Sequence, residues 1–317
     1  MNKYTKRVNV LFLSIILLYL GIVVLFSILK SSGHTVTMLP SLLISEAIIL
    51  VPGICMIAAA KMPLKEYIPH RRIKISTALL LIVLSYALMP VASFINILSQ
   101  FLTENVLASS ATDIMSQPFI VMLFIMGIYG PLCEEFIFRG IIYSGYTKSG
   151  RVWGAILMSS LLFGLMHMNL NQFGYAFFLG IAFAIVIKIT DSLLATVIMH
   201  CVINLHNVSM MYGSQYMLKA AGMKQDMEKY SQGIKALGDG IYGVVIVLFI
   251  VSIFAIAISG LLLYAITRNE NRLDVWNRLF HKNMQVEAEG IQKQGMLTVP
   301  LCIAIIICVS WIIYGLM

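Results

Sequence analysis

Ionisable and amide side chains stand at three points of an otherwise apolar sequence, and their types suit the hydrolysis of a peptide bond. An ionisable group at membrane depth costs at least about 2.5 kcal/mol, so three charges within one short stretch indicate a function. A carboxylate and an imidazole can hold a water molecule and take its proton. A second imidazole and an amide can donate hydrogen bonds to a developing oxyanion. The candidate residues are Glu134, Glu135, Arg139, His167, His200 and Asn204.

Helical spacing groups these residues. Glu135 and Arg139 are four residues apart, so on a helix they share a face and we expect them to form an ion pair. Glu134 is turned by about 100° from Glu135 and is left to face another group. His200 and Asn204 are also four residues apart and share a face. Helices that bring these faces together would form one polar cavity.

The residues allow two chemistries, and both stay open at this point. In the first, a carboxylate and an imidazole activate a water molecule without a metal ion. In the second, Glu134, His167 and His200 form a zinc site of two histidines and one glutamate, with an open fourth position. Other intramembrane protease chemistries find no support, because the sequence has no HExxH, no GxSG and no GxGD within an apolar run.

The elements that must position these residues are transmembrane helices. The chain is 60% hydrophobic and 11% charged, with a mean hydropathy of +0.91, which excludes a soluble domain. Windows of about 20 apolar residues span the hydrocarbon of a bilayer. They predict an all-α, polytopic membrane helical bundle with about nine transmembrane helices. The predicted spans are Val8–Leu29, Met38–Ala60, Ser76–Leu98, Pro118–Tyr143, Val152–His167, Phe173–Ile187, Ser192–Met211, Ile241–Ile266 and Leu297–Met317.

We divide the chain into three regions on this basis. Residues 1–117 form an N-terminal region of three spans, and residues 118–211 form a four-helix catalytic core. Residues 212–317 hold an outer loop, two spans and an inner loop. We expect short amphipathic structure in the outer loop, Tyr212–Gly240, and a polar inner loop at Thr267–Met296.

The loops alternate in charge, which predicts the orientation. With a cytoplasmic N-terminus, 16 of the 22 Lys and Arg residues fall in inner loops and 5 in outer loops, with Arg139 left over. This is the positive-inside pattern of a multi-pass protein of the cell membrane. The net charge of +8 is therefore a topology signal and requires no nucleic-acid partner. Membrane lipids are the partners that this composition predicts.

One residue sits at an unexpected depth. A rise of about 1.5 Å per residue places Glu134 and His200 in the inner half of the membrane and His167 near the outer end. Because the linker 168–172 is short, we expect this hairpin to be recessed or tilted, so that His167 reaches the cavity. A separation of more than about 10 Å from both other residues would contradict this hypothesis.

Two further ionisable residues in the spans are given structural interpretations. Glu46 lies in the second span without an evident partner, and a contact with the core or simple protonation explains it. His206 lies about 240° around the seventh helix from His200, so we leave it out of the site.

Three motifs on successive predicted helices resemble those of the CAAX protease and bacteriocin-processing (CPBP) family. They are Glu-Glu-x-x-x-Arg at 134–139, Phe-x-x-x-His at 163–167 and His-x-x-x-Asn at 200–204. The family includes type II CAAX prenyl endopeptidases and bacterial Abi-like membrane proteases. The resemblance covers about 30% of the chain, from Pro118 to Met211.

This resemblance implies an intramembrane endopeptidase of the CPBP type, acting on a membrane-embedded or lipidated peptide or protein. It implies that Glu134 and His167 activate the water, and that His200 and Asn204 stabilise the oxyanion. Glu135 and Arg139 would support the site. The family is often labelled a metalloprotease, which would require zinc, whereas activation of water by glutamate needs no metal. Its eukaryotic members act in CAAX-box protein maturation.

Two other classes of protein stay open. A secondary transporter also buries charges near the bilayer midplane, but it should show paired inverted halves or broken helices in matching positions, and the sequence shows neither. A non-catalytic bacteriocin-immunity or membrane scaffold protein would keep the fold without needing a pair of residues that activates water.

Overall fold

The protein is a bundle of helices in a computed structural model that describes residues 3–220, 238, 240–280 and 294–316. Within a bilayer every backbone N–H and C=O must be satisfied internally, and helices satisfy them within one segment. Apolar helices occur at all nine predicted positions. They are α1 (Lys3–Ser31), α2 (Met38–Ala59), α4 (Ile75–Ser99), a composite helix (Phe119–Thr147), α10 (Val152–Met166), α11 (Leu170–Thr190), α12 (Leu193–Ala220), α14 (Gly240–Asn269) and α17 (Val299–Tyr314).

Seven of the helices in the described part of the chain are long and apolar enough to cross a membrane. The two shorter ones are α10, with 15 residues, and α17, with 16. At about 1.5 Å per residue, α10 reaches little more than two thirds of the hydrocarbon thickness. The prediction of a polytopic helical membrane protein is confirmed.

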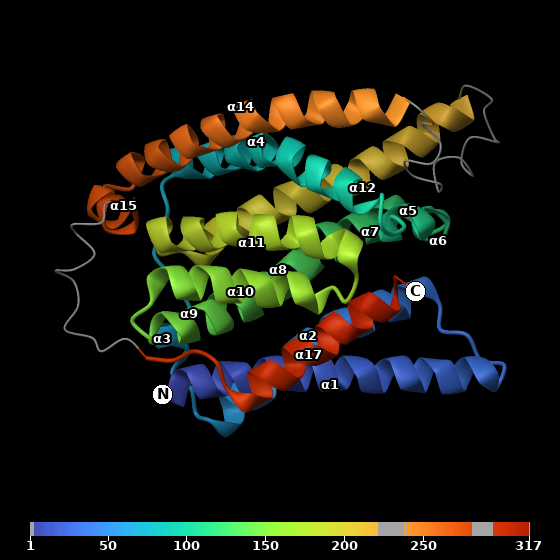
Figure 1. Cartoon of the computed structure of the whole chain (residues 1–317), viewed down its shortest axis with the longest axis horizontal. Coiled ribbons are helices and arrows are strands. Elements are labelled where there is room, and N and C mark those ends of the chain that lie inside the picture. The colour runs from blue at the N-terminus through green and yellow to red at the C-terminus, as the bar shows by residue number, and fades with distance from the viewer. Residues whose placement is uncertain (1–2, 221–237, 239, 281–293, 317) are drawn as a thin grey trace.

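The helices pack in layers around the composite helix (Figure 1). On one side, α14 lies along α4, and α4 packs on α11 and α12. On the other side, α1 packs against α2 and α17. The composite helix lies between them and contacts α2, α10, α11 and α12. The segment that carries the carboxylates is therefore enclosed by helices from both halves of the chain.

The hairpin of α10 and α11 is packed closely through small side chains. A Cβ atom added to Gly180 would lie 3.0 Å from Cβ of Ser160 and 3.1 Å from its Cα. Small residues at such contacts let two helix backbones approach in a bilayer, where the hydrophobic effect does not drive helices together. This contact fixes α10, and His167 at its end, against α11.

The basic loops gather at one end of the bundle. In Figure 1 the N-terminus, α3 (Leu64–Tyr67), α9 (Ser144–Thr147) and α15 (Leu273–Phe280) lie at the same end. Hydrogen bonds join these loops, including those from Arg71 Nη2 to the carbonyl of Glu270 at 2.9 Å and from the Gln294 N–H to the carbonyl of Ser149 at 3.1 Å. The basic loops, which we predicted to lie on one side of the membrane, therefore lie at one end of the bundle. The cytoplasmic placement of that end stays a prediction.

The loops hold more helix than we expected. The seventh helix continues past Met211 to Ala220, and the rest of the predicted outer loop, 221–237 and 239, lies outside the described residues. The inner loop contains α15, and its residues 281–293 are also outside the description. The segment before the composite helix forms α5 (Val106–Ser109) and α6 (Ala111–Met115). The Tyr212 hydroxyl anchors this segment by donating to the carbonyls of Ile114 and Gln117 at 2.6 and 2.8 Å.

Large apolar side chains cover the outside of the bundle. Val24, Ile54, Phe254 and Ile306, on four different helices, are each more than half exposed. In water such a surface would be unfavourable, whereas in a bilayer it faces acyl chains. Membrane lipids are therefore in contact with this protein.

Candidate active site

The carboxylates lie on a helix that contains two π-helical turns, which the sequence did not predict. The composite helix consists of five parts in succession: α7 (Phe119–Phe124), η1 (Ile125–Tyr129), α8 (Gly130–Glu135), η2 (Phe136–Tyr143) and α9 (Ser144–Thr147). π turns are rare and occur frequently at functional sites. Here both flank the six-residue segment α8, which carries the two glutamates.

Pro131 explains why a side chain from another helix is needed at the first π turn. The N–H of Gly130 donates to the carbonyl of Ile125, five residues earlier. The next donor in this pattern would be residue 131, but proline has no N–H, so the carbonyl of Met126 would have no backbone donor. Asn204 Nδ2 donates to that carbonyl at 3.0 Å. The predicted oxyanion donor thus has one of its two N–H groups engaged by the backbone.

Glu135 is the centre of a buried polar cluster. Its Oε1 accepts hydrogen bonds from Arg139 Nη1 at 2.9 Å and from His200 Nδ1 at 3.0 Å. The Glu135 side chain is 0% exposed and that of Arg139 is 1% exposed. The guanidinium lies 4.1 Å from the ring centroid of Phe163 and 5.2 Å from that of Phe183. The predicted ion pair is confirmed, and the sequence missed both the histidine that shares it and the two aromatic rings.

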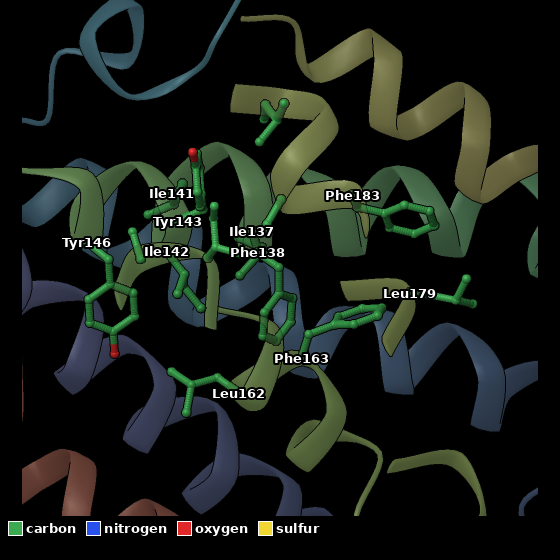
Figure 2. Packing of buried hydrophobic residues seen from close by; sticks show 14 of the residues in the cluster. Ile137, Phe138, Ile141, Ile142, Tyr143, Tyr146, Leu162, Phe163, Leu179 and Phe183 are labelled. Carbon is green, nitrogen blue, oxygen red and sulfur yellow. The ribbon is translucent and has the colours of Figure 1, made fainter. Parts of the chain in front are cut away.

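The aromatic rings belong to the main apolar core of the protein. Phe138, Phe163 and Phe183 lie within one cluster of buried side chains (Figure 2). The rings of Phe138 and Phe163 meet edge to face with centroids 5.3 Å apart. An arginine between aromatic faces gains cation–π energy that is larger when the pair is removed from water. The core therefore holds the guanidinium, and the guanidinium holds Glu135.

Glu134 faces the cavity and not the buried cluster. Its Oε2 lies 3.7 Å from Nε2 of His200, and its side chain is 16% exposed. Because a carboxylate only accepts, Nδ1 of His200 carries the hydrogen donated to Glu135, and Nε2 is the nitrogen presented to Glu134. A separation of 3.7 Å is too long for a direct hydrogen bond, which leaves both groups available to one water molecule on the cavity side.

The end of α10 fixes the orientation of His167. The N–H of His167 donates to the carbonyl of Gly164, so the carbonyl of Phe163 is one of the unpaired groups of the helix end. Nδ1 of His167 lies 2.9 Å from that carbonyl and must carry the hydrogen, since a carbonyl only accepts. Met168 then turns the chain with φ 54°, and Asn169 caps the next helix through the N–H of Gln172. Nε2 of His167 is left unprotonated.

Glu134, His167, His200 and Asn204 line one cavity of about 660 Å³. Both imidazoles contact the ring of Phe163, with centroid separations of 5.3 Å for His167 and 5.9 Å for His200. The turn between α10 and α11 stops short of the ends of α1 and α12, as expected for a recessed hairpin (Figure 1). The structure thus brings the four predicted residues together, and their chemical roles stay predictions.

Residues outside the predicted catalytic core also line the cavity. Ile15 of α1, Glu46 of α2 and Met89 of α4 line it, so the region before residue 118 contributes to the site. His206 lines it as well, with its ring edge to face against Tyr86 at 5.4 Å between centroids. We left His206 out of the site by its helical angle, and that interpretation stays a prediction, although the cavity extends along α12 beyond the face that carries His200 and Asn204.

The predicted zinc ligands do not form a metal site as they stand. Among the described residues, no group of three His, Cys, Asp or Glu side chains is close enough to hold one metal ion. Zinc bonds to nitrogen and oxygen ligands are about 2.0–2.2 Å long, so Glu134, His167 and His200 would have to move together to share an ion. The zinc prediction stays a prediction, and no step derived below passes through a metal.

Known proteins match part of the chain. A family described as "Type II CAAX prenyl endopeptidase Rce1-like" matches residues 116–206. The chain is 30% identical over 84 residues to "Putative membrane peptidase YdiL" of Bacillus subtilis (strain 168), which covers 26% of this chain and 34% of that protein. It is 29% identical over 97 residues to "Membrane-embedded CAAX protease MroQ" of Staphylococcus aureus (strain USA300), covering 29% and 39%. No solved structure matches the chain significantly.

The family match is confined to the site region. The chain spans between a third and two fifths of the length of the two curated relatives. The matched stretch, 116–206, includes all six residues that we predicted for the site. The predicted resemblance to the family of CAAX proteases is confirmed for this stretch.

Proposed function

We propose that this protein is an intramembrane endopeptidase in which Glu134 activates a water molecule that attacks a peptide bond. The observation that carries the proposal is the shared cavity, where a carboxylate and two imidazole Nε2 atoms face the same space. The substrate is a membrane-embedded or lipidated peptide or protein, because the cavity lies among apolar helices. The names of the relatives, a membrane peptidase and a membrane-embedded CAAX protease, support the same class of reaction.

The positions of the polar atoms support the following mechanism. A water molecule between Glu134 and His167 loses a proton to the carboxylate, and its oxygen attacks the carbonyl carbon. The carbonyl oxygen becomes an oxyanion, which His200 stabilises from its Nε2 side. Glu135, held by Arg139, orients the His200 ring by accepting from Nδ1 at 3.0 Å. The free N–H of Asn204 is the second donor.

A trap variant tests the proposal. Glu134→Gln keeps the shape of the side chain but cannot take a proton, so we expect it to bind substrate without turnover. Membranes from cells that express Glu134→Gln are solubilised and the variant is purified. The peptides that it retains are identified by mass spectrometry. Glu66→Gln, at an exposed carboxylate of α3, is the matched control. Turnover of the trapped partner by Glu134→Ala at the wild-type rate would contradict the proposal.

The first defined probe is a farnesylated CAAX peptide, since the matching family is described as a prenyl endopeptidase. We expect purified wild-type protein in liposomes to release the terminal tripeptide from this probe. The Glu134→Gln variant should release none, while Glu66→Gln should match the wild type. If the protein cleaves an unprenylated membrane peptide and not the farnesylated one, it is still an endopeptidase, but its substrate class is different.

A further inference from the structure

Glu46 is a third carboxyl group at the cavity, and the mechanism above does not use it. It lies on α2, which packs against α8, and it lines the same cavity as Glu134 and His200. Its Oε2 is buried and has no hydrogen-bond partner among the described residues. A buried polar atom without a partner costs free energy, so its presence needs a reason.

A glycine of α8 makes room for this carboxyl group. A Cβ atom added to Gly130 would lie 3.1 Å from Oε1 of Glu46 and 3.5 Å from its Cδ. The carboxyl group therefore lies over the bare backbone at Gly130. Gly130 and Glu134 are four residues apart in α8, so they lie on the same helix face. Glu46 thus meets α8 one helical turn before the proposed base, on the face that carries it.

The ion pairs around the cavity leave Glu46 without a counter-ion. Arg139, the guanidinium nearest to the site, is bonded to Glu135 and not to Glu46. No ion pair among the described residues includes Glu46. A buried carboxyl group without a cation beside it is favoured in its neutral form, because burial penalises the charge. The cavity therefore holds an acid beside a base.

We propose that Glu46 is the general acid of the proposed hydrolysis and delivers a proton to the leaving amine. This inference rests on the proposed peptidase function. Water loses one proton to Glu134 while its oxygen bonds to the carbonyl carbon. The carbon–nitrogen bond then breaks as the Glu46 carboxyl group gives its proton to nitrogen, which yields a carboxylic acid and an amine. The proton on Glu134 finally passes to Glu46, and both groups return to their starting states.

A chemical label tests the proton on Glu46 without any assay of turnover. N,N′-dicyclohexylcarbodiimide adds to protonated carboxyl groups in apolar surroundings and leaves a stable acylurea. We expect mass spectrometry of the labelled full chain to find the adduct on Glu46 and none on the exposed Glu66. If Glu46 is unlabelled, whether or not Glu134 reacts, the proposal is overturned.

The leaving group separates an acid from a structural carboxyl group. Two farnesylated CAAX peptides are compared, one with the normal scissile amide and one with a thioester, whose thiolate leaves without a proton. Glu46→Gln should slow amide cleavage by about 10²-fold, the contribution of one general acid, and leave thioester cleavage near the wild-type rate. Glu134→Gln should slow both, and the exposed control Glu66→Gln should slow neither.

The outcomes keep this inference apart from the proposed function. Equal slowing of amide and thioester by Glu46→Gln overturns the role of Glu46 while the peptidase stands. Rescue of amide cleavage by Glu46→Asp, which restores an acid on a shorter side chain, supports the role. If the wild type cleaves neither peptide although Glu46 is labelled, the proposed function fails for this substrate and the acid role fails with it.

Discussion

At the scale of single residues, two adjacent glutamates differ completely in their surroundings. Glu135 is sealed from the cavity and shares Oε1 with Arg139 and His200. Glu134, one position earlier and about 100° around the helix, faces the cavity and lies 3.7 Å from Nε2 of His200. One carboxylate therefore sets the orientation of the imidazole, and the other is free to act on water.

Removal of Arg139 should destabilise the protein by leaving Glu135 buried without its cation. We expect Arg139→Ala to lower the free energy of unfolding by about 3–5 kcal/mol, measured as a loss of folded protein in detergent on heating. Adding Glu135→Gln should restore much of it, because the uncompensated charge is then gone. Arg151→Ala, at an exposed arginine in the next loop, is the control. A double variant as unstable as Arg139→Ala would contradict the ion pair.

The arginine itself, and not only its charge, should matter. The guanidinium lies against the rings of Phe163 and Phe183, and a lysine ammonium does not reproduce this planar stacking. We therefore expect Arg139→Lys to recover only part of the stability lost in Arg139→Ala, by the same heating measurement. Full recovery would show that a positive charge alone is sufficient beside Glu135.

Metal removal should leave turnover unchanged. The described side chains present no group of three that could hold an ion, so we expect purified protein treated with a zinc chelator to cleave at the untreated rate. The opposite result would be activity that a chelator abolishes and added zinc restores, in the wild type but not in His200→Ala. It would show that Glu134, His167 and His200 close on a metal ion.

At the scale of helices, a proline in the composite helix couples two elements. Pro131 removes the backbone donor for the carbonyl of Met126, and Asn204 of α12 supplies a side-chain donor in its place. The π turn is thus held by the helix that also carries His200. The distance between Glu134 and His200 depends on this link, because Glu134 is three positions from Pro131 and His200 is four positions from Asn204.

A double variant separates the two roles open to Asn204. As an oxyanion donor, Asn204→Ala should slow turnover by about 10²–10³-fold. Because Asn204 also donates to the Met126 carbonyl, Asn204→Ala should lower the free energy of unfolding by about 1–3 kcal/mol. Pro131→Ala restores an N–H in reach of that carbonyl, so in the Asn204→Ala background it should recover stability but not turnover. Recovery of both would leave Asn204 with a positioning role alone.

At the scale of the whole molecule, the inner loops are joined into one layer. Glu270, at the end of α14, is 1% exposed and accepts from the N–H of Lys74 at 3.0 Å. Arg272 pairs with Asp191 at 3.7 Å, which links this layer to the turn between α11 and α12. The end of the bundle that carries most of the basic residues is therefore a single connected surface.

The orientation of this surface can be measured by labelling. In a variant without native cysteines, Ser32→Cys and Lys65→Cys place one exposed thiol at each end of the bundle. With a cytoplasmic N-terminus, we expect an impermeant maleimide to label Ser32→Cys in intact cells. Lys65→Cys should react only after permeabilisation. The reverse result would place the N-terminus outside and contradict the positive-inside prediction.

The sequence by itself determined the class of protein and the apolar helices of the described part of the chain, and it singled out four residues that line one cavity. Runs of apolar residues must form helices in a bilayer, because nothing else satisfies the backbone there. Spacing of four residues on one helix was enough to predict the pair of Glu135 and Arg139. Both inferences are local, since each concerns one segment and its own periodicity.

Only the tertiary structure decided which groups meet across helices. The bond from His200 to Glu135, the cap of Asn204 on Met126 and the approach of Glu46 to Gly130 each join segments more than 60 residues apart. Such contacts depend on how helices pack and rotate, and the π turns shift that rotation in a way that a regular helical wheel does not contain. For the same reason, the helical angle between His200 and His206 did not predict that both side chains line one cavity.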